Sequence, residues 1–173
     1  MNADLHLTPA DLAELDRQAA ASPRRRMHRN LHASPVEPCQ RLINAMRPDS
    51  YIRPHRHRDY VTNECLLALR GCFLLIEFDD SGSILAALRM GGPDADLLIA
   101  EVPPERWQTV VALQDDCVLF ETKSGPYDAG AAKSSALWAP AEESAEAPAY
   151  LAGLLAQSLA LVEGRRPGES PAR

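Results

Sequence analysis

The segment between residues 39 and 123 is a succession of short apolar runs separated by tight turns, and this pattern limits the fold more than any other feature of the chain. Eight runs rich in branched and aromatic residues occupy it: CQRLINAM, SYIRPHRH, ECLLALR, CFLLIEF, SILAALRM, DLLIAEV, RWQTVVAL and CVLFETK. Turn-forming pieces such as DDSGS and GGPDAD separate them. Closely spaced strands without a helical pattern between them predict a mainly β fold, an antiparallel double-sheet sandwich or barrel.

A helix is expected on each side of this segment. Thr8 can cap the first helix, Pro9 suits its first position, and Asp11 favours its positive end. The run PAYLAGLLAQSLALVE predicts the second helix, which begins at a proline and presents a leucine face that needs a cover. The stretch 24–38 reads as irregular and basic, and 139–148 reads as a linker. The expected organisation is an N-terminal helix in 1–23, a barrel domain in 24–143, a C-terminal helix in 148–164 and a disordered tail in 165–173.

Composition excludes some classes of function. A chain of 173 residues with a net charge of −6 is an unfavourable partner for nucleic acid. No apolar run approaches the roughly 20 residues that cross a bilayer, and the N-terminus lacks a secretion signal, so a cytoplasmic location without membrane contact is expected. Nine arginines lie between residues 24 and 58. They indicate either a local site for an anion or a solvated face.

The segment PHRHRDYVTNECLLALRG, residues 54–71, carries the most chemical information. Residues two apart on a strand share a face, so His55 and His57 should project together, with Tyr51 and Arg53 on the same side. Two imidazoles placed in this way can bind one divalent metal. Glu64 opens the next strand, and an antiparallel return could bring its carboxylate beside them. The alternative is a buried polar cluster that hydrogen bonds satisfy.

Two motifs in the chain resemble those of the cupins. PHRH followed by a glutamate and a glycine resembles the first cupin motif, and VPPERWQT, residues 102–109, resembles the second. More closely, the chain resembles the WbuC family of cupin-fold metalloproteins, which is associated with bacterial surface-polysaccharide gene clusters. The pieces that carry this resemblance are RNLH (29–32), EPCQRLINA (37–45), SYIRPHRH (50–57), FETKSGPY (120–127) and ALWAP (136–140).

The resemblance implies a jelly-roll barrel, one bound divalent metal and a homodimer. The metal ligands that it implies are His55, His57, Glu64 and Gln108, with zinc, nickel, iron and manganese as the candidate ions. Gln108 departs from the family, which carries histidine at this position of the second motif. An amide oxygen binds most transition metals less tightly than imidazole, so weak metal binding is expected.

A ligand pocket is expected beside the metal. Its candidate residues are Arg29, Asn30, His32, Arg53, Glu121, Lys123 and Tyr127. Arginine suggests that the ligand is a small anion. Three of these assignments have alternatives of similar weight: a solvated loop position for His32, a surface pair for Glu121 and Lys123, and simple packing for Tyr127.

Three functions are compatible with such a site. The first is a metal-dependent enzyme that acts on a small polar or sugar-derived molecule, for example an isomerase, epimerase or oxygenase-type cupin. The second is a non-catalytic binder or sensor with a weakened or lost metal site, which Gln108 favours. The third is a structural protein whose metal only stabilises the barrel. An open coordination position would favour the first two functions, and a closed one would favour the third.

Overall fold

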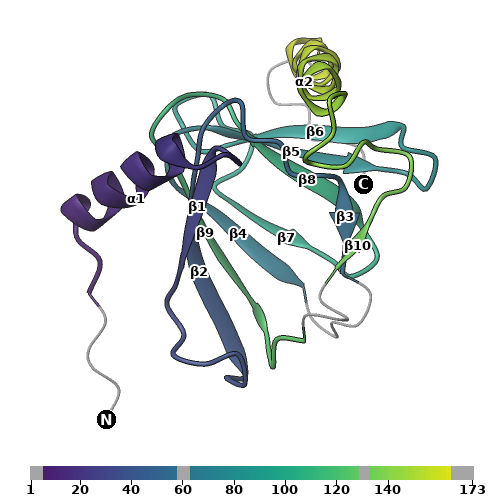
Figure 1. Ribbon diagram of the computed structural model, residues 1–173. Coiled ribbons are helices and arrows are strands. Elements are labelled where there is room, and N and C mark those ends of the chain that lie inside the picture. Colours follow the sequence, from purple (N-terminus) through teal and green to yellow (C-terminus); the bar gives the residue numbers. More distant parts are fainter. Residues whose placement is uncertain (1–5, 58–62, 129–132, 165–173) are drawn as a thin grey trace.

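The computed structural model describes residues 6–57, 63–128 and 133–164, and ten strands over these ranges form two antiparallel five-stranded sheets that face each other (Figure 1). The first sheet contains, in spatial order, β1 (Arg26–Asn30), β2 (Cys39–Met46), β9 (Cys117–Ser124), β4 (Glu64–Arg70) and β7 (Ile99–Val102). The second contains β10 (Ser134–Ser135), β3 (His55–Arg56), β8 (Trp107–Ala112), β5 (Phe73–Phe78) and β6 (Ile84–Met90). We call them the first and second sheets throughout.

The order of the strands is that of a jelly roll. The chain passes between the two sheets so that β2, β9, β4 and β7 are neighbours in one, and β3, β8, β5 and β6 are neighbours in the other. The eight runs of the sequence correspond to these eight strands. The predicted fold class, an antiparallel double-sheet barrel with flanking helices, is therefore confirmed.

Alternation along the strands builds the core between the sheets. Inward-facing side chains from both sheets form one buried apolar cluster: Met46, Leu66, Phe73, Leu75, Met90, Ala100, Val102, Val110, Ala112, Cys117 and Leu119. Gly71 makes the tight turn between β4 and β5 at a φ of +81°, and a Cβ atom there would lie 2.5 Å from the sulfur of Cys117. This cluster fills one end of the interior and leaves the polar residues at the other.

Helix α1 (Pro9–Ala21) covers part of the outer face of the first sheet. Thr8 caps it in a capping box with Asp11, as the sequence predicted. Leu15 and Ala19 pack against Ile43 of β2. The sequence could specify this helix because its capping signals are local.

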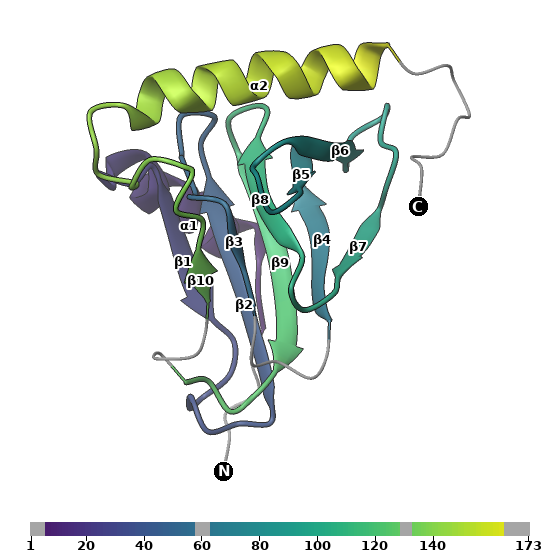
Figure 2. The ribbon, with the colours of Figure 1, turned by 90° about the vertical axis from the view of Figure 1, so that its right-hand side faces the viewer.

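Helix α2 (Ala147–Glu163) lies against the outer face of the second sheet (Figure 2). Leu151 and Leu154 are buried against Leu74 and Ile76 of β5 and Val111 of β8. The chain's own barrel therefore covers the leucine face. Within the described ranges, no helix combines the length and apolar character needed to cross a membrane.

The structure corrects several local predictions. Residues 26–30, predicted to be irregular, form β1, which pairs with β2 from Arg26↔Met46 to Asn30↔Leu42. Backbone pairing with β2 determines the extended conformation of this edge strand. Most of its side chains are polar and exposed, so the sequence shows no apolar alternation there. Strand β10 was also missed. The tail 165–173 lies outside the described residues.

The run SYIRPHRH contributes only the two residues of β3 to a sheet. Because residues 51–54 are not in a strand, the alternation expected from Tyr51 to His57 does not hold. Tyr51 packs in the cluster under α2 and donates a hydrogen bond to the Pro140 carbonyl at 3.0 Å. The prediction that Tyr51 shares the face of the histidines is wrong.

Candidate metal centre

The two histidines of the PHRH segment lie together at the polar end of the barrel. His55 is in β3, directly opposite Gln108 of β8, and His57 follows the strand. Their rings are nearly perpendicular, at 87°, with centroids 5.3 Å apart. Both side chains are almost completely buried. The segment that leads into β3 is held by Thr109 of β8, whose hydroxyl donates to the Ile52 carbonyl at 2.7 Å.

The contacts of His55 define its tautomer. Its Nδ1 lies 3.1 Å from the Arg53 carbonyl oxygen, which can only accept a hydrogen bond, so Nδ1 carries the proton. The other ring nitrogen, Nε2, then offers its lone pair to the interior. Burial, with a contribution from the charge of Lys133, lowers the pKa of His55 to about 3. His55 is therefore neutral, which is the state that can bind a metal.

Glu64 completes a three-residue cluster with the histidines. It begins β4 in the opposite sheet, and its Oε1 lies 3.4 Å from His57 Nε2. One ligand atom from each of His55, His57 and Glu64 lies within 4.8 Å of the other two. Two imidazole nitrogens and one carboxylate oxygen at this separation match the ligand set of a divalent transition metal.

Gln108 is in direct contact with this cluster. Its Nε2 lies 3.1 Å from His55 Nε2 and 3.3 Å from Glu64 Oε2, so the amide donates toward both. Its Oε1 is buried and has no hydrogen-bond partner among the described residues. A half-turn of the amide would bring this oxygen to the atoms that would hold an ion. The residues present therefore fit a divalent metal, with Gln108 as a fourth, neutral oxygen ligand.

A row of buried charges adjoins the cluster on the side of β9. The ammonium of Lys123 lies 3.0 Å from Glu64 Oε1 and 2.7 Å from Glu121 Oε1, and all three side chains are largely buried. Glu121 and Lys123 are thus inside the barrel, and the surface-pair alternative is wrong. The pair shares a face because the two residues are two apart on one strand.

Burial and charge act in opposite directions on these carboxyl groups. Burial alone would raise the pKa of Glu64, but the hydrogen bond with His57 and the charge of Lys123 hold it well below its usual range. For Glu121, burial and the nearby Glu64 charge outweigh Lys123 and raise the pKa to about 7. Glu64 is therefore ionised at neutral pH, as a metal ligand must be.

Arg53 is the one candidate pocket arginine whose backbone contacts the site. Its carbonyl holds His55, and its backbone N–H donates to Glu142 at 3.3 Å. Its Nε is buried without a hydrogen-bond partner in the described part of the chain. Arg53 is thus available to an added acceptor.

The structure does not bring the other four candidates to the histidines. Arg29 forms an ion pair with Asp11 of α1 at 3.1 Å, and Asn30 is exposed at the end of β1. His32 Nδ1 accepts a hydrogen bond from the Arg41 backbone at 3.0 Å, which fixes a loop. Tyr127 is 45% exposed. None of these positions has a contact with the metal cluster among the interactions of the described residues.

Sequence reasoning missed the support that residues 139–148 give to the site. Glu142 lies in this predicted linker, yet it forms a partly buried ion pair with Arg26 and accepts from the Arg53 backbone. Lys133 was not foreseen either, although its charge contributes to the low pKa of His55. Such contacts join residues about a hundred positions apart, and a single sequence carries no local signal for them.

Comparisons with known proteins say little about activity. A family model described as a domain of unknown function (DUF6016) matches residues 7–90, which include both histidines and Glu64. No curated protein matches the chain.

Three solved structures illustrate the similarity. A protein from Shewanella oneidensis is 12% identical with a TM-score of 0.49, covering 62% of this chain and 72% of that one. KdgF from Halomonas sp. is 16% identical with a TM-score of 0.46, covering 62% and 84%. Oxalate decarboxylase from Bacillus subtilis is 13% identical with a TM-score of 0.48, covering 64% of this chain and 27% of that one. The strand order of the two sheets, rather than these similarities, identifies the jelly roll.

Proposed function

We propose that this protein is a metal-binding jelly roll of the cupin type, which holds one divalent ion between His55, His57 and Glu64 and binds a small polar ligand beside it. The observation that carries the proposal is the convergence of three ligand atoms within 4.8 Å of one another in a buried, polar end of the barrel. The low pKa of His55 and the ionised state of Glu64 give the ligands the protonation that a metal requires.

A bound divalent ion would supply a Lewis acid that polarises a carbonyl or hydroxyl oxygen of the ligand. The residues of the chain do the rest. The Lys123 ammonium can donate to a ligand oxygen, and the Glu121 carboxyl can orient a hydroxyl group. The apolar cluster that includes Leu66 and Val110 closes the inner end of the site to water.

The ligand that this environment favours is anionic or sugar-derived. The Lys123 ammonium lies at the site, and Arg53, whose backbone carbonyl contacts His55, has a buried Nε without an acceptor among the described residues. A guanidinium group matches the geometry of carboxylate and phosphate. The resemblance to the WbuC family supports a ligand from surface-polysaccharide metabolism, on which the chain would act as an isomerase or epimerase.

A second candidate is a ligand binder that works without a metal. The hydrogen bonds from Gln108 to His55 and Glu64 favour it, since they already satisfy groups that would otherwise bind an ion. In this case the same pocket would recognise its ligand through the buried charges of Lys123 and Glu121.

Calorimetric titration of chelator-stripped protein with zinc tests the first proposal. We expect the native chain to bind one equivalent and the double variant His55→Ala, His57→Ala to bind none. The matched control is His28→Ala, because His28 is an exposed histidine on β1. Absence of uptake by the native chain at millimolar zinc, nickel, manganese or ferrous iron would leave the metal-free binder as the function. Isosteric Glu64→Gln serves where the double variant does not fold.

The ligand class and the assembly have their own tests. Sugar phosphates, nucleotide sugars and small carboxylates should raise the melting temperature, and the proposal fails if only neutral ligands do. A homodimer is proposed from the resemblance to cupins alone, because α2 is covered within the chain. A monomer in light scattering at micromolar and higher concentrations contradicts it.

A further inference from the structure

The strand that carries both histidines has little backbone pairing to hold it. β3 contains two residues, and its register with β8 consists of the single pair His55↔Gln108. On the other side, β10 pairs with it over two residues. A metal site loses affinity when its ligands are poorly oriented. Contacts other than backbone pairing must therefore help to hold the two histidines in position.

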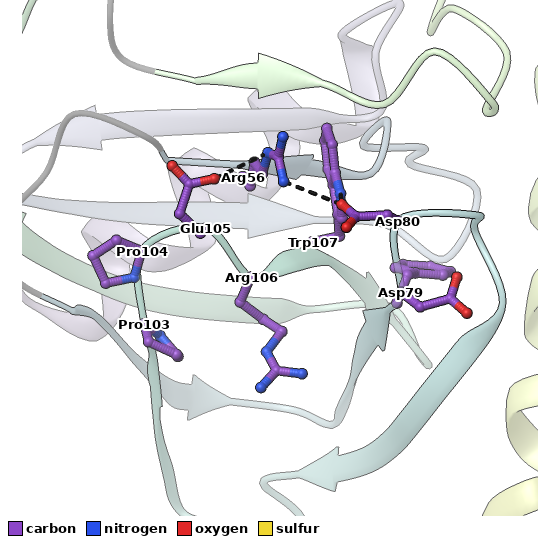
Figure 3. Close-up of a pocket in the computed structure, with 9 residues that line it drawn as sticks. Arg56, Asp79, Asp80, Pro103, Pro104, Glu105, Arg106 and Trp107 are labelled. Carbon is purple, nitrogen blue, oxygen red and sulfur yellow. Dashed lines mark hydrogen bonds and ion pairs between the residues drawn. The ribbon is translucent and has the colours of Figure 1, made fainter.

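Arg56 supplies contacts of this kind on the opposite face of β3. Because it lies between His55 and His57, its side chain points away from the metal cluster and out of the barrel. It borders a surface cavity of about 410 Å³ that Phe78, Pro103 and Pro104 also line. Figure 3 shows the Arg56 guanidinium between two carboxylates, with Trp107 beside it.

Four side chains form what we call the outer clamp: Arg56, Trp107, Asp80 and Glu105. The guanidinium carbon lies 4.3 Å from the centroid of the Trp107 ring. Its Nη1 is 3.2 Å from Asp80 Oδ1, and its Nε is 3.4 Å from Glu105 Oε2. The indole N–H of Trp107 donates to the same Asp80 oxygen at 2.9 Å. Only 13% of the Arg56 side chain is exposed, which favours its stacking on Trp107, while Asp80 and Glu105 face solvent with exposed fractions of 87% and 55%.

The outer clamp connects to the backbone of every site residue on the second sheet. Arg56 joins His55 and His57, and Trp107 directly precedes Gln108. In addition, the backbone N–H of Glu105 donates to the His57 carbonyl at 3.0 Å. Fixing Arg56 on Trp107 therefore fixes β3 against β8 at the one position where the two strands pair.

We propose that Arg56 is a positioning residue, which the outer clamp holds so that His55 and His57 aim at the same point inside the barrel. The expected effect on zinc affinity rests on the proposed metal site, whereas the expected effect on the orientation of the His55 and His57 rings does not. Arginine suits this role because its planar group can stack on an indole and bond to two carboxylates at once. Lysine can stack but cannot bridge both acceptors in this way.

The test compares Arg56→Met with Arg106→Met. Arg106 borders the same cavity and pairs with Glu77 at 3.6 Å, but it adjoins no histidine, so it is the matched control. The first readout uses metal-free protein: the ring ¹⁵N signals of His55 and His57 report tautomer and orientation. We expect one tautomer of His55 in the native chain and in Arg106→Met, and a mixture in Arg56→Met.

The second readout is zinc affinity by calorimetry. Arg56→Met should weaken it about tenfold or more, Arg56→Lys should weaken it less, and Arg106→Met should leave it unchanged. Unchanged ring signals and unchanged affinity in a folded Arg56→Met overturn the positioning role. If the ring signals change in Arg56→Met but the native chain takes up no zinc, the result supports the outer clamp and contradicts the metal site. If Arg56→Met does not fold, Asp80→Asn replaces it. Asp80 is largely exposed, so the substitution should be tolerated, and it weakens the contacts of Asp80 with Arg56 and with Trp107.

Discussion

Replacing Gln108 with histidine tests the chemistry of the centre most directly. The Gln108 amide already contacts His55 Nε2 at 3.1 Å and Glu64 Oε2 at 3.3 Å. The Nε2 atom of histidine lies as many bonds from Cβ as the amide atoms of glutamine, so an imidazole can reach the same place. It would replace a weak oxygen donor with a stronger nitrogen donor.

The size of the effect follows from what is exchanged. The native amide must give up its hydrogen bonds to His55 and Glu64 before its oxygen can face an ion, whereas a neutral imidazole presents a lone pair directly. Loss of one hydrogen bond of this kind is worth roughly 1 kcal/mol. We expect Gln108→His to raise zinc affinity by about tenfold or more, which corresponds to about 1.4 kcal/mol.

The assay is a zinc titration of chelator-stripped protein, native and variant, at constant pH and buffer. Gln108→Leu serves as a control of similar size that can donate nothing to the metal, and it should bind more weakly than the native chain. The double change His55→Ala, His57→Ala should abolish binding in both backgrounds. Equal zinc affinity in the native, His and Leu forms would show that position 108 does not reach the ion and would refute the reasoning.

Three further predictions concern stability and are measured by urea denaturation. Thr8→Ala removes the acceptor for the Asp11 N–H in the capping box and should lower the free energy of unfolding by about 1 kcal/mol. Leu154→Ala, in the cluster under α2, should lower it by about 2–5 kcal/mol, and a loss below 1 kcal/mol would mean that α2 is not firmly packed. Burial would raise the pKa of Glu142, but the Arg26 hydrogen bond and charge bring it below its usual range. A carboxyl group with a lowered pKa stabilises the fold above its unfolded pKa of about 4.3 and stops doing so as the pH falls through the folded value. Glu142→Gln should therefore destabilise the protein at pH 7, and its difference from the native chain should shrink at about pH 3; a difference that grows on acidification would contradict this sign.

The part of the fold that the sequence could predict is the part that local patterns specify. The runs that became β2 and β4 have the predicted bounds because their apolar residues and turns are contiguous. The capping of α1 by Thr8 is local in the same sense. Strand β1 was missed because MHRN owes its conformation to pairing with β2, a contact that its own residues do not announce.

The candidate site divides in the same way. The pairing of the two histidines was predictable from their spacing, and Gln108 from its place in the second motif. The side from which Gln108 reaches the histidines depends on the sheet topology, because β8 is the neighbour of β3 and the amide lies beside His55. Arg53 could be placed only roughly, and the role of Glu142 not at all, because the path of 139–148 over the barrel depends on tertiary packing.

The charges around Glu64 have a consequence for the thermodynamics of the whole site. In the metal-free state the Lys123 ammonium pairs with both the Glu64 and the Glu121 carboxyl groups, and His55 is neutral. A divalent ion would therefore add positive charge in a place that water hardly reaches, next to the ammonium. An anion that enters with it would restore electroneutrality. Metal and anionic ligand should thus bind cooperatively, each raising the affinity of the other by the same factor, so that neither partner alone measures the affinity of the pair.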